Sequence, residues 1–134
     1  MFGKSLNPLS AYAEAGIAAK VQAASPHQLI LLLFDGAATA IGVAGLHIEQ
    51  NDVAQKGKHI SQAIDIINNG LKVSLNTEAG GQLAEQLSAL YDYMCRRLIA
   101  ANIGNDVVAL DEVAHLLDEI HSAWKEIAPT NTGG

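Results

Sequence analysis

Residues 25–48, SPHQLILLLFDGAATAIGVAGLHI, decide the fold class of this chain because they predict one long and almost uniformly apolar helix. Ser25 is placed to cap this helix, Pro26 suits its first position, and Gln28 completes a capping box with Ser25. The helix can run to about Glu49, where a polar turn follows. A capped apolar helix of this length favours a fold of packed helices.

The same segment is long enough to be a transmembrane helix, which needs roughly 20 apolar residues. Between Leu29 and Ile48 it carries one formal charge, Asp35. A carboxylate near the middle of a membrane span costs about 2.5–3.5 kcal/mol on insertion scales, and no Lys or Arg flanks either end to set an orientation. We therefore expect this helix to pack inside a bundle and not to insert into a membrane.

The composition of the whole chain also favours a fold of packed helices. Its 134 residues are 49% hydrophobic but only 4% aromatic, a balance that suits helices better than strands. The net charge is −6 and no basic cluster occurs, which argues against nucleic acid or an anionic membrane as the primary partner. A single cysteine, Cys95, excludes an internal disulfide and fits a reducing cytosol. The N-terminus lacks the continuous apolar run of a secretory signal.

Three further helices are expected after the first. They are predicted over residues 53–75, 82–102 and 106–127, with Asp52 capping the second, 76–81 as a loop, Gly104 just beyond the third, and Asn105 or Asp106 capping the fourth. Near the helix ends, the predicted apolar stripes include Val53, Leu83, Val107 and Ile127. The fold class is therefore all-α, an antiparallel up-and-down four-helix bundle over residues 25–128. Residues 1–24 stand apart from the bundle, and residues 129–134 are expected to be a disordered tail.

The first helix carries more apolar surface than a bundle requires. Phe34 and Ile41 fall roughly opposite or beside Leu29 and Leu33, so the helix lacks an adequately polar side to face solvent. Exposed apolar patches larger than about a few hundred Å² usually mark a binding surface. The N-terminal segment, a partner helix and a second copy of the chain all remain open as the cover.

Catalytic and metal-binding patterns are poor in this sequence. The one Glu-x-x-His, Glu112 to His115, falls short of a di-metal site, which needs two such pairs and further glutamates, so both residues are interpreted as lying on a solvated face. His121 stands in an apolar stripe and is interpreted as a packed histidine, and Cys95 as a structural thiol. Neither a GxSxG motif nor a glycine-rich phosphate loop is present. We therefore expect no enzyme activity, no cofactor and no metal site.

The stretch LYDYMCRRL, residues 90–98, holds the densest group of unusual side chains. Tyr91 and Tyr93 flank Asp92, and Arg97 follows the predicted core stripe, where it must snorkel or pair with a carboxylate. One interpretation is a hydrogen-bonded end of the bundle. The other is the rim of a peptide-binding surface, because Tyr and Arg are typical anchors of interfaces.

The chain resembles the flagellin-specific export chaperones of bacterial flagella, the FliS type. The likeness rests on AY (11–12), SPHQLILLLFDGA (25–37), GGQLAEQLSALYDYMCRRLIAANIGND (80–106) and LLDEIHSAWKEI (116–127). It covers residues 11–127 in the same order, and the LYDYM–RRL–AN combination is its most specific part.

This resemblance implies a cytosolic, non-enzymatic chaperone. Such a protein binds the disordered C-terminal region of flagellin, prevents its premature polymerisation and hands it to components of the export gate. It also implies that residues 1–24 form a variable N-terminal cap segment over part of an apolar groove, with Tyr12 as the tyrosine of that cap.

Six residues are the candidate flagellin contacts. They are Tyr12, Phe34, Ile41, Tyr91, Tyr93 and Arg97. A monomer or weak homodimer is expected without the client. The alternative is a homo-oligomeric structural or regulatory bundle with no flagellin client, in which another copy covers the first helix.

Overall fold

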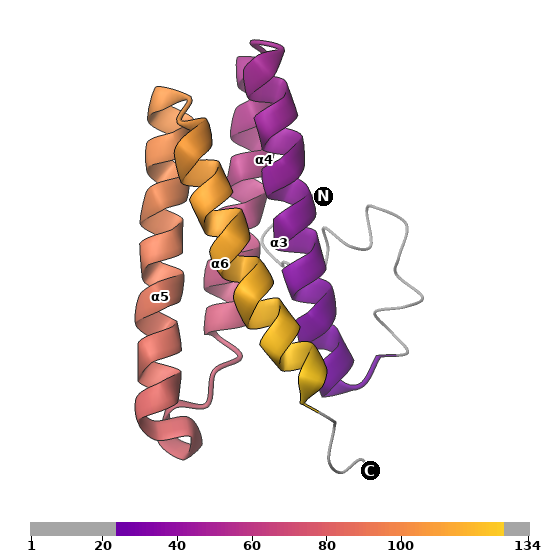
Figure 1. Cartoon of the computed structure of the whole chain (residues 1–134), viewed down its shortest axis with the longest axis vertical. Helices are drawn as coiled ribbons and strands as arrows, with labels where there is room; N and C mark the ends of the chain where they lie inside the picture. The colour runs from indigo at the N-terminus through magenta and orange to yellow at the C-terminus, as the bar shows by residue number, and fades with distance from the viewer. Residues whose placement is uncertain (1–23, 128–134) are drawn as a thin grey trace.

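The computed structural model describes residues 24–127, apart from the side chains of residues 77–79, and these form four packed helical segments with no strand among them (Figure 1). The segments are α3 (Pro26–Glu49), α4 (Val53–Ile66) continued by the π-helix η2 (Ile67–Lys72), α5 (Thr77–Gly104) and α6 (Val107–Glu126). The prediction of an all-α fold is confirmed. Residues 1–23 and the predicted tail lie outside the described residues.

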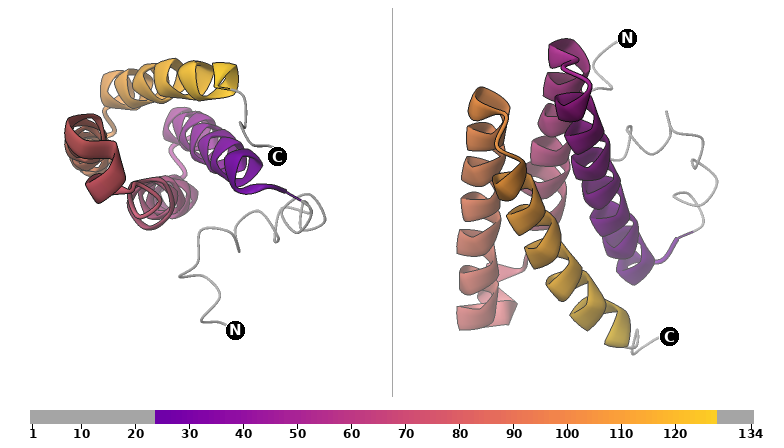
Figure 2. Two further views of the ribbon diagram at one scale, coloured as in Figure 1. Left: turned by 90° about the horizontal axis from the view of Figure 1, so that it is seen from below. Right: turned by 45° about the horizontal axis from the view of Figure 1, so that its top comes forward.

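Successive helices run in opposite directions and each packs on the next. α3 contacts α4, α4 and η2 contact α5, α5 contacts α6, and α6 returns to α3. The last helix crosses the bundle obliquely: it begins beside α5 and ends beside the start of α3 (Figures 1 and 2). This oblique path brings α6 closest to a different neighbour at each of its two ends.

Three predicted helix starts are confirmed by their capping hydrogen bonds. The Gln28 N–H donates to Ser25 Oγ at 3.2 Å and the Ser25 N–H donates to Gln28 Oε1 at 3.0 Å, which completes the capping box. Asp52 caps α4 and Asp106 caps α6 through their side-chain oxygens. Local sequence alone therefore sets where these helices begin.

Two predicted connections differ from the structure. α5 begins at Thr77, so the prediction of a loop over residues 76–81 is wrong except for a break at Gly81, whose φ of 56° and ψ of −133° are not helical. Gly104 is the last residue of α5, and the left-handed position after the helix belongs to Asn105, with φ of 51°. Asparagine visits this conformation more readily than most side chains because it hydrogen-bonds locally.

The predicted second helix is not a single α-helix. α4 ends at Ile66 and the wider π-helix η2 continues to Lys72. A π-helix changes the side-chain period, and here it keeps Ile67, Gly70 and Leu71 all buried. The periodic pattern of the sequence does not separate these two helix types.

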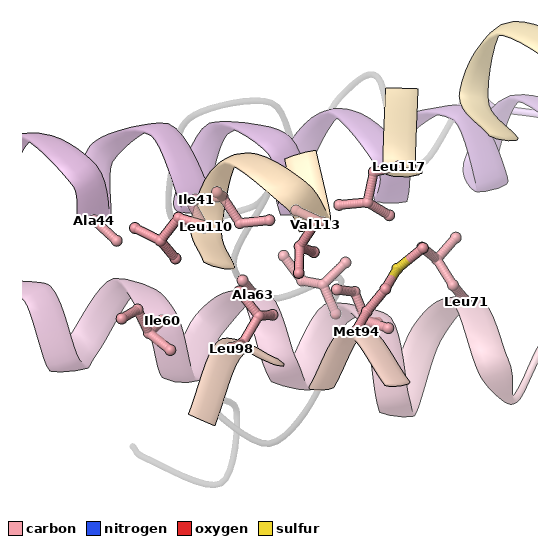
Figure 3. Close-up of a cluster of buried hydrophobic side chains, with 14 of the residues drawn as sticks. Ile41, Ala44, Ile60, Ala63, Leu71, Met94, Leu98, Leu110, Val113 and Leu117 are labelled. Carbon is pink, nitrogen blue, oxygen red and sulfur yellow. The ribbon is translucent and has the colours of Figure 1, made fainter. Parts of the chain in front are cut away.

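The core is built from all four helical segments (Figure 3). Its largest fully buried side chains are Phe34, Ile60, Ile66, Ile67, Leu71, Met94, Leu98, Leu110, Val113 and Leu117. The predicted burial of the apolar stripes is wrong at the helix ends. The exposed fractions there are 69% for Val53, 65% for Leu83, 39% for Val107 and 52% for Ile127. A side chain in the last turn of a helix has fewer neighbouring helices to bury it.

α3 is apolar on its buried face, and its outer face carries small residues together with one exposed leucine, Leu46 at 56%. Phe34 and Ile41 share the buried face with Leu33, whereas Ala38 and Gly42 are exposed. The sequence leaves open which face of this helix is core, and the structure places Phe34 and Ile41 in the core because both follow its 3.6-residue period. By length and composition α3 is apolar enough to cross a membrane, a test that the core helix of a soluble protein also passes.

Candidate functional site

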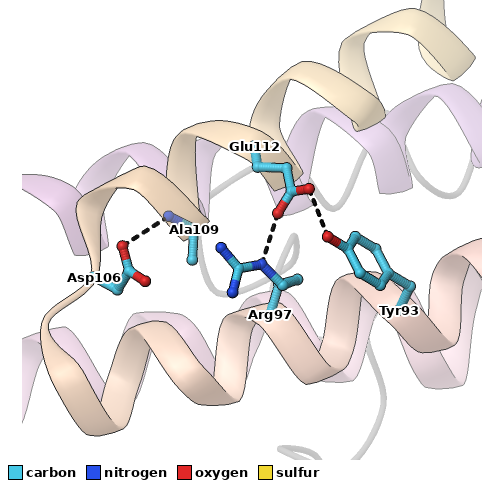
Figure 4. Close-up of polar contacts among 5 residues, drawn as sticks. All are labelled: Tyr93, Arg97, Asp106, Ala109 and Glu112. Carbon is cyan, nitrogen blue, oxygen red and sulfur yellow. Dashed lines mark hydrogen bonds and ion pairs between the residues drawn. The ribbon is translucent and has the colours of Figure 1, made fainter.

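Tyr93 and Arg97 lie one turn apart on the side of α5 that faces α6, where they share a carboxylate (Figure 4). Glu112 Oε1 accepts a hydrogen bond from Arg97 Nε at 2.6 Å, and Glu112 Oε2 accepts one from the Tyr93 hydroxyl at 2.6 Å. The pairing of Arg97 with a carboxylate is thus confirmed. The interpretation of Glu112 as a purely solvated residue is wrong, since its position beside the core stripe faces the neighbouring helix.

Electrostatics favour one protonation state of this cluster. The hydrogen bonds from Tyr93 and Arg97 lower the pKa of Glu112 below its usual value. The hydrogen bond to Glu112 in turn raises the pKa of Tyr93. At neutral pH the cluster therefore contains a carboxylate, a guanidinium and a neutral phenol, an arrangement that ties α5 to α6.

The other candidate contacts are placed differently. Phe34, Ile41 and Tyr91 lie in the core and are only 1%, 3% and 3% exposed. Burial raises the pKa of Tyr91 to about 12. Tyr12 lies outside the described residues. The structure thus brings Tyr93 and Arg97 together at the surface and puts the three other described candidates beneath it.

The C-terminal half of α6 contacts α3 through rings. The Trp124 indole stacks on His27 with 4.9 Å between ring centroids, and its Nε1 donates to the His27 carbonyl oxygen at 3.2 Å. One turn earlier, His121 stacks on Phe34 at 5.2 Å, and its Nε2 lies 3.8 Å from Asp35 Oδ1. The interpretation of His121 as a packed histidine is confirmed.

As a result, α6 diverges from α5 towards the C-terminal end of α6 (Figures 1 and 2). By helical spacing, apolar side chains of α5 follow the face that carries Tyr93 and Arg97, and apolar side chains of α6 follow the face that carries Glu112. Four of them are partly buried and two are exposed, and we call the six together the α5–α6 strip. Its members are Leu83, Leu87 and Leu90 of α5, Leu116 and Ile120 of α6, and Ile127 just after α6. The Tyr93–Glu112–Arg97 cluster stands at the closed end of the strip.

Within the described chain, no three His, Cys, Asp or Glu side chains form a group that could hold a metal ion. Cys95 is half-buried, with its Sγ 3.9 Å from the carbonyl oxygen of Ile64. Burial raises the pKa of this thiol, which disfavours the reactive thiolate. The strip and its polar end place apolar side chains next to hydrogen-bonding groups, a combination typical of protein interfaces.

Comparison with known proteins gives consistent matches over nearly the whole chain. The family model described as Flagellar protein FliS matches residues 8–131. The chain is 53% identical over 121 residues to the flagellar secretion chaperone FliS of Salmonella typhimurium, an alignment that covers 90% of each protein. It is 47% identical over 116 residues to FliS of Escherichia coli, covering 87% of this chain and 85% of that protein. It is 41% identical over 123 residues to FliSB of Pseudomonas aeruginosa, covering 92% of this chain and 97% of that protein.

Proposed function

The chain belongs to the FliS family of flagellar secretion chaperones, which are not enzymes, and from this premise we propose that its client is the C-terminal region of flagellin. In this proposal the chain acts in the cytosol, prevents premature polymerisation of flagellin and passes it to components of the export gate. It inserts into no membrane, binds no nucleic acid, and is a monomer or weak homodimer until the client arrives.

The α5–α6 strip is the observation that carries this proposal. An amphipathic helix binds a partner by laying its apolar side along an unpaired apolar surface. The strip offers such a surface, because Leu83 is 65% and Ile127 is 52% exposed at the end of the strip farthest from the Tyr93–Glu112–Arg97 cluster. A disordered segment that folds on binding typically buries about 1,000–3,000 Å² and loses about 2–5 kcal/mol to ordering, so the client also needs contacts beyond the strip.

The candidate contacts take two roles in this proposal. Tyr93 and Arg97 contact the client directly at the closed end of the strip, since both side chains are part-buried and not enclosed. Phe34, Ile41 and Tyr91 support the surface from the core beneath it.

Tyr12 belongs to the proposed N-terminal cap. If residues 1–24 cover part of the client surface, their removal raises the affinity for the client or provokes aggregation of the free chaperone. A truncated chain whose affinity and solubility both match those of the full chain contradicts the cap.

The test compares exposed apolar residues at the two ends of the bundle. We expect Leu83→Ser with Ile127→Ser to weaken binding of a flagellin C-terminal segment about tenfold or more in calorimetry, because burying one such side chain contributes about 1.5–3 kcal/mol and about 1.4 kcal/mol is a factor of ten. The matched control is Ile103→Ser with Val108→Ser, at positions 82% and 73% exposed beside the α5–α6 turn. Equal weakening by both pairs, or no weakening by the first, contradicts the proposed site.

A further inference from the structure

The C-terminal half of α6 is held on α3 by two ring stacks, and each contains a histidine. Trp124 stacks on His27, and His121 stacks on Phe34. The His121 side chain is only 11% exposed, whereas Asp35, its neighbour on α3, is 61% exposed. The part-buried histidine of the second stack therefore lies at the contact between the two helices.

The surroundings of His121 favour its neutral form. Burial is the largest influence and lowers its pKa below the usual value, and Lys125 on the same helix lowers it further. Asp35 of α3 and Asp118 of α6 act in the opposite direction and only partly offset burial. Among the described residues, the charges that act on His121 come from α3 and α6 and none comes from α4 or α5.

These contacts decide the position of one side of the α5–α6 strip. Ile120 lies in the half of α6 that His121 and Trp124 hold against α3, Ile127 lies just after that half, and Leu116 lies at the middle of the helix. The tie between α6 and α5 is at Glu112, nearer the N-terminal end of α6. A change at the α3 contact can therefore move this half of α6 while the Glu112 cluster stays intact.

We propose that His121 is a pH-sensitive latch, which holds the C-terminal half of α6 on α3 when it is neutral and releases it when it is protonated. The latch is closed above about pH 6.5, the ordinary histidine value, and loosens as the pH falls below it, because the seated state resists the added charge. The effect of the latch on client binding rests on the proposed function of the strip, whereas the latch itself is independent of that function.

The first measurement is amide hydrogen exchange of the full chain by NMR, expressed as protection factors that correct for the pH dependence of exchange itself. We expect the protection of residues 118–126 to fall several-fold between about pH 7.5 and about pH 5.5, on either side of the ordinary histidine pKa, with residues 108–114 unchanged. Equal protection of residues 118–126 at the two pH values overturns the latch.

Three variants separate His121 from other causes. His121→Phe keeps a ring against Phe34 but cannot be protonated, so the protection of residues 118–126 becomes independent of pH. Asp35→Asn removes a carboxylate that favours the protonated ring in the seated state, so the fall in protection between about pH 7.5 and about pH 5.5 becomes larger. His27→Gln keeps the carbonyl that accepts from Trp124 and leaves the pH effect in place. A pH effect that survives in His121→Phe and disappears in His27→Gln contradicts the proposal.

Binding of a flagellin C-terminal segment is then measured at both pH values. A pH-dependent affinity in the natural chain that is lost in His121→Phe supports the link between the latch and the strip. Changed protection together with no binding at either pH contradicts the proposed client and leaves the latch standing.

Discussion

At Lys56 a positively charged side chain lies inside the bundle, only 6% exposed. Its Nζ donates to the carbonyl oxygen of Asn102 at 2.8 Å and to Oδ1 of Asn105 at 2.7 Å. A cation at the C-terminal end of a helix satisfies carbonyl groups that have no partner within the helix and complements the helix dipole. Lys56 thereby fixes the α5–α6 turn to α4, including the left-handed residue Asn105.

Replacing this lysine tests its role. We expect Lys56→Met, which keeps the apolar stem, to lower the free energy of unfolding by about 1–3 kcal/mol, because buried acceptors lose their donor. The control is Lys58→Met at an exposed position of the same helix, with an expected change within about 0.5 kcal/mol. Urea denaturation measures both, and equal midpoints for the two variants contradict this account.

A second residue prediction concerns Glu112. Its pKa is lowered from 4.5 in the folded chain, so its contribution to stability is complete above about pH 4.5 and is lost as the pH falls through the lowered pKa. We expect Glu112→Gln to unfold at lower urea concentration than the natural chain near neutral pH, with a difference that shrinks in acid.

The matched control for Glu112 is Glu119→Gln. Glu119 is more exposed, and within the described part of the chain its ion pair is with His115 of its own helix, at 3.3 Å. Its substitution should change the urea midpoint less at every pH, because exposed pairs contribute little. A Glu112→Gln effect no larger than that of Glu119→Gln, or one that persists unchanged in acid, contradicts the role assigned to the cluster.

At the scale of helices, two glycines have opposite structural roles. Gly81 breaks α5 after its first turn with a φ of 56° and a ψ of −133°, which side chains other than glycine rarely adopt. Gly42 lies within α3, and a Cβ placed there meets nothing within 4 Å. The backbone conformation at position 81 requires glycine, whereas the helical backbone at position 42 does not.

The substitutions Gly81→Ala and Gly42→Ala should therefore have opposite signs. We expect Gly81→Ala to lower the free energy of unfolding by about 1–3 kcal/mol. Gly42→Ala should raise it by about 0.4–1 kcal/mol, since alanine restricts the unfolded chain and suits the helix. Thermal unfolding of both variants checks this, and two changes of the same sign contradict the backbone assignment.

The helix starts could be predicted from the sequence because caps are local. Ser25, Asp52 and Asp106 each bond to a backbone N–H three residues ahead, so a short window contains the whole signal. The first turn of α5 was missed because Gly80 and Gly81 indicate a loop in the sequence. The π-helix η2 could not be predicted, since packing against other helices decides it. Glu112 was missed for the same reason, because its partners lie on another helix.

At the scale of the whole molecule, the path of α6 links fold to function. Its N-terminal half is tied to α5 by Glu112 and its C-terminal half to α3 by Trp124. From Glu112 towards Trp124, α6 separates from α5 (Figure 1), and apolar side chains of these two helices are partly exposed. The small outer face of α3, with Ala38 and Gly42, accounts for an apolar helix that shows solvent few large side chains.

The central claim is that a single copy of this chain binds a flagellar client through that surface. Size-exclusion chromatography with light scattering tests it most directly, on the full chain alone and with the C-terminal segment of flagellin from the same organism. The account predicts a species of one chain that becomes a complex of one chain with one client segment. A stable dimer whose mass does not change when flagellin is added would contradict it and would make a second copy the partner of the exposed apolar surface.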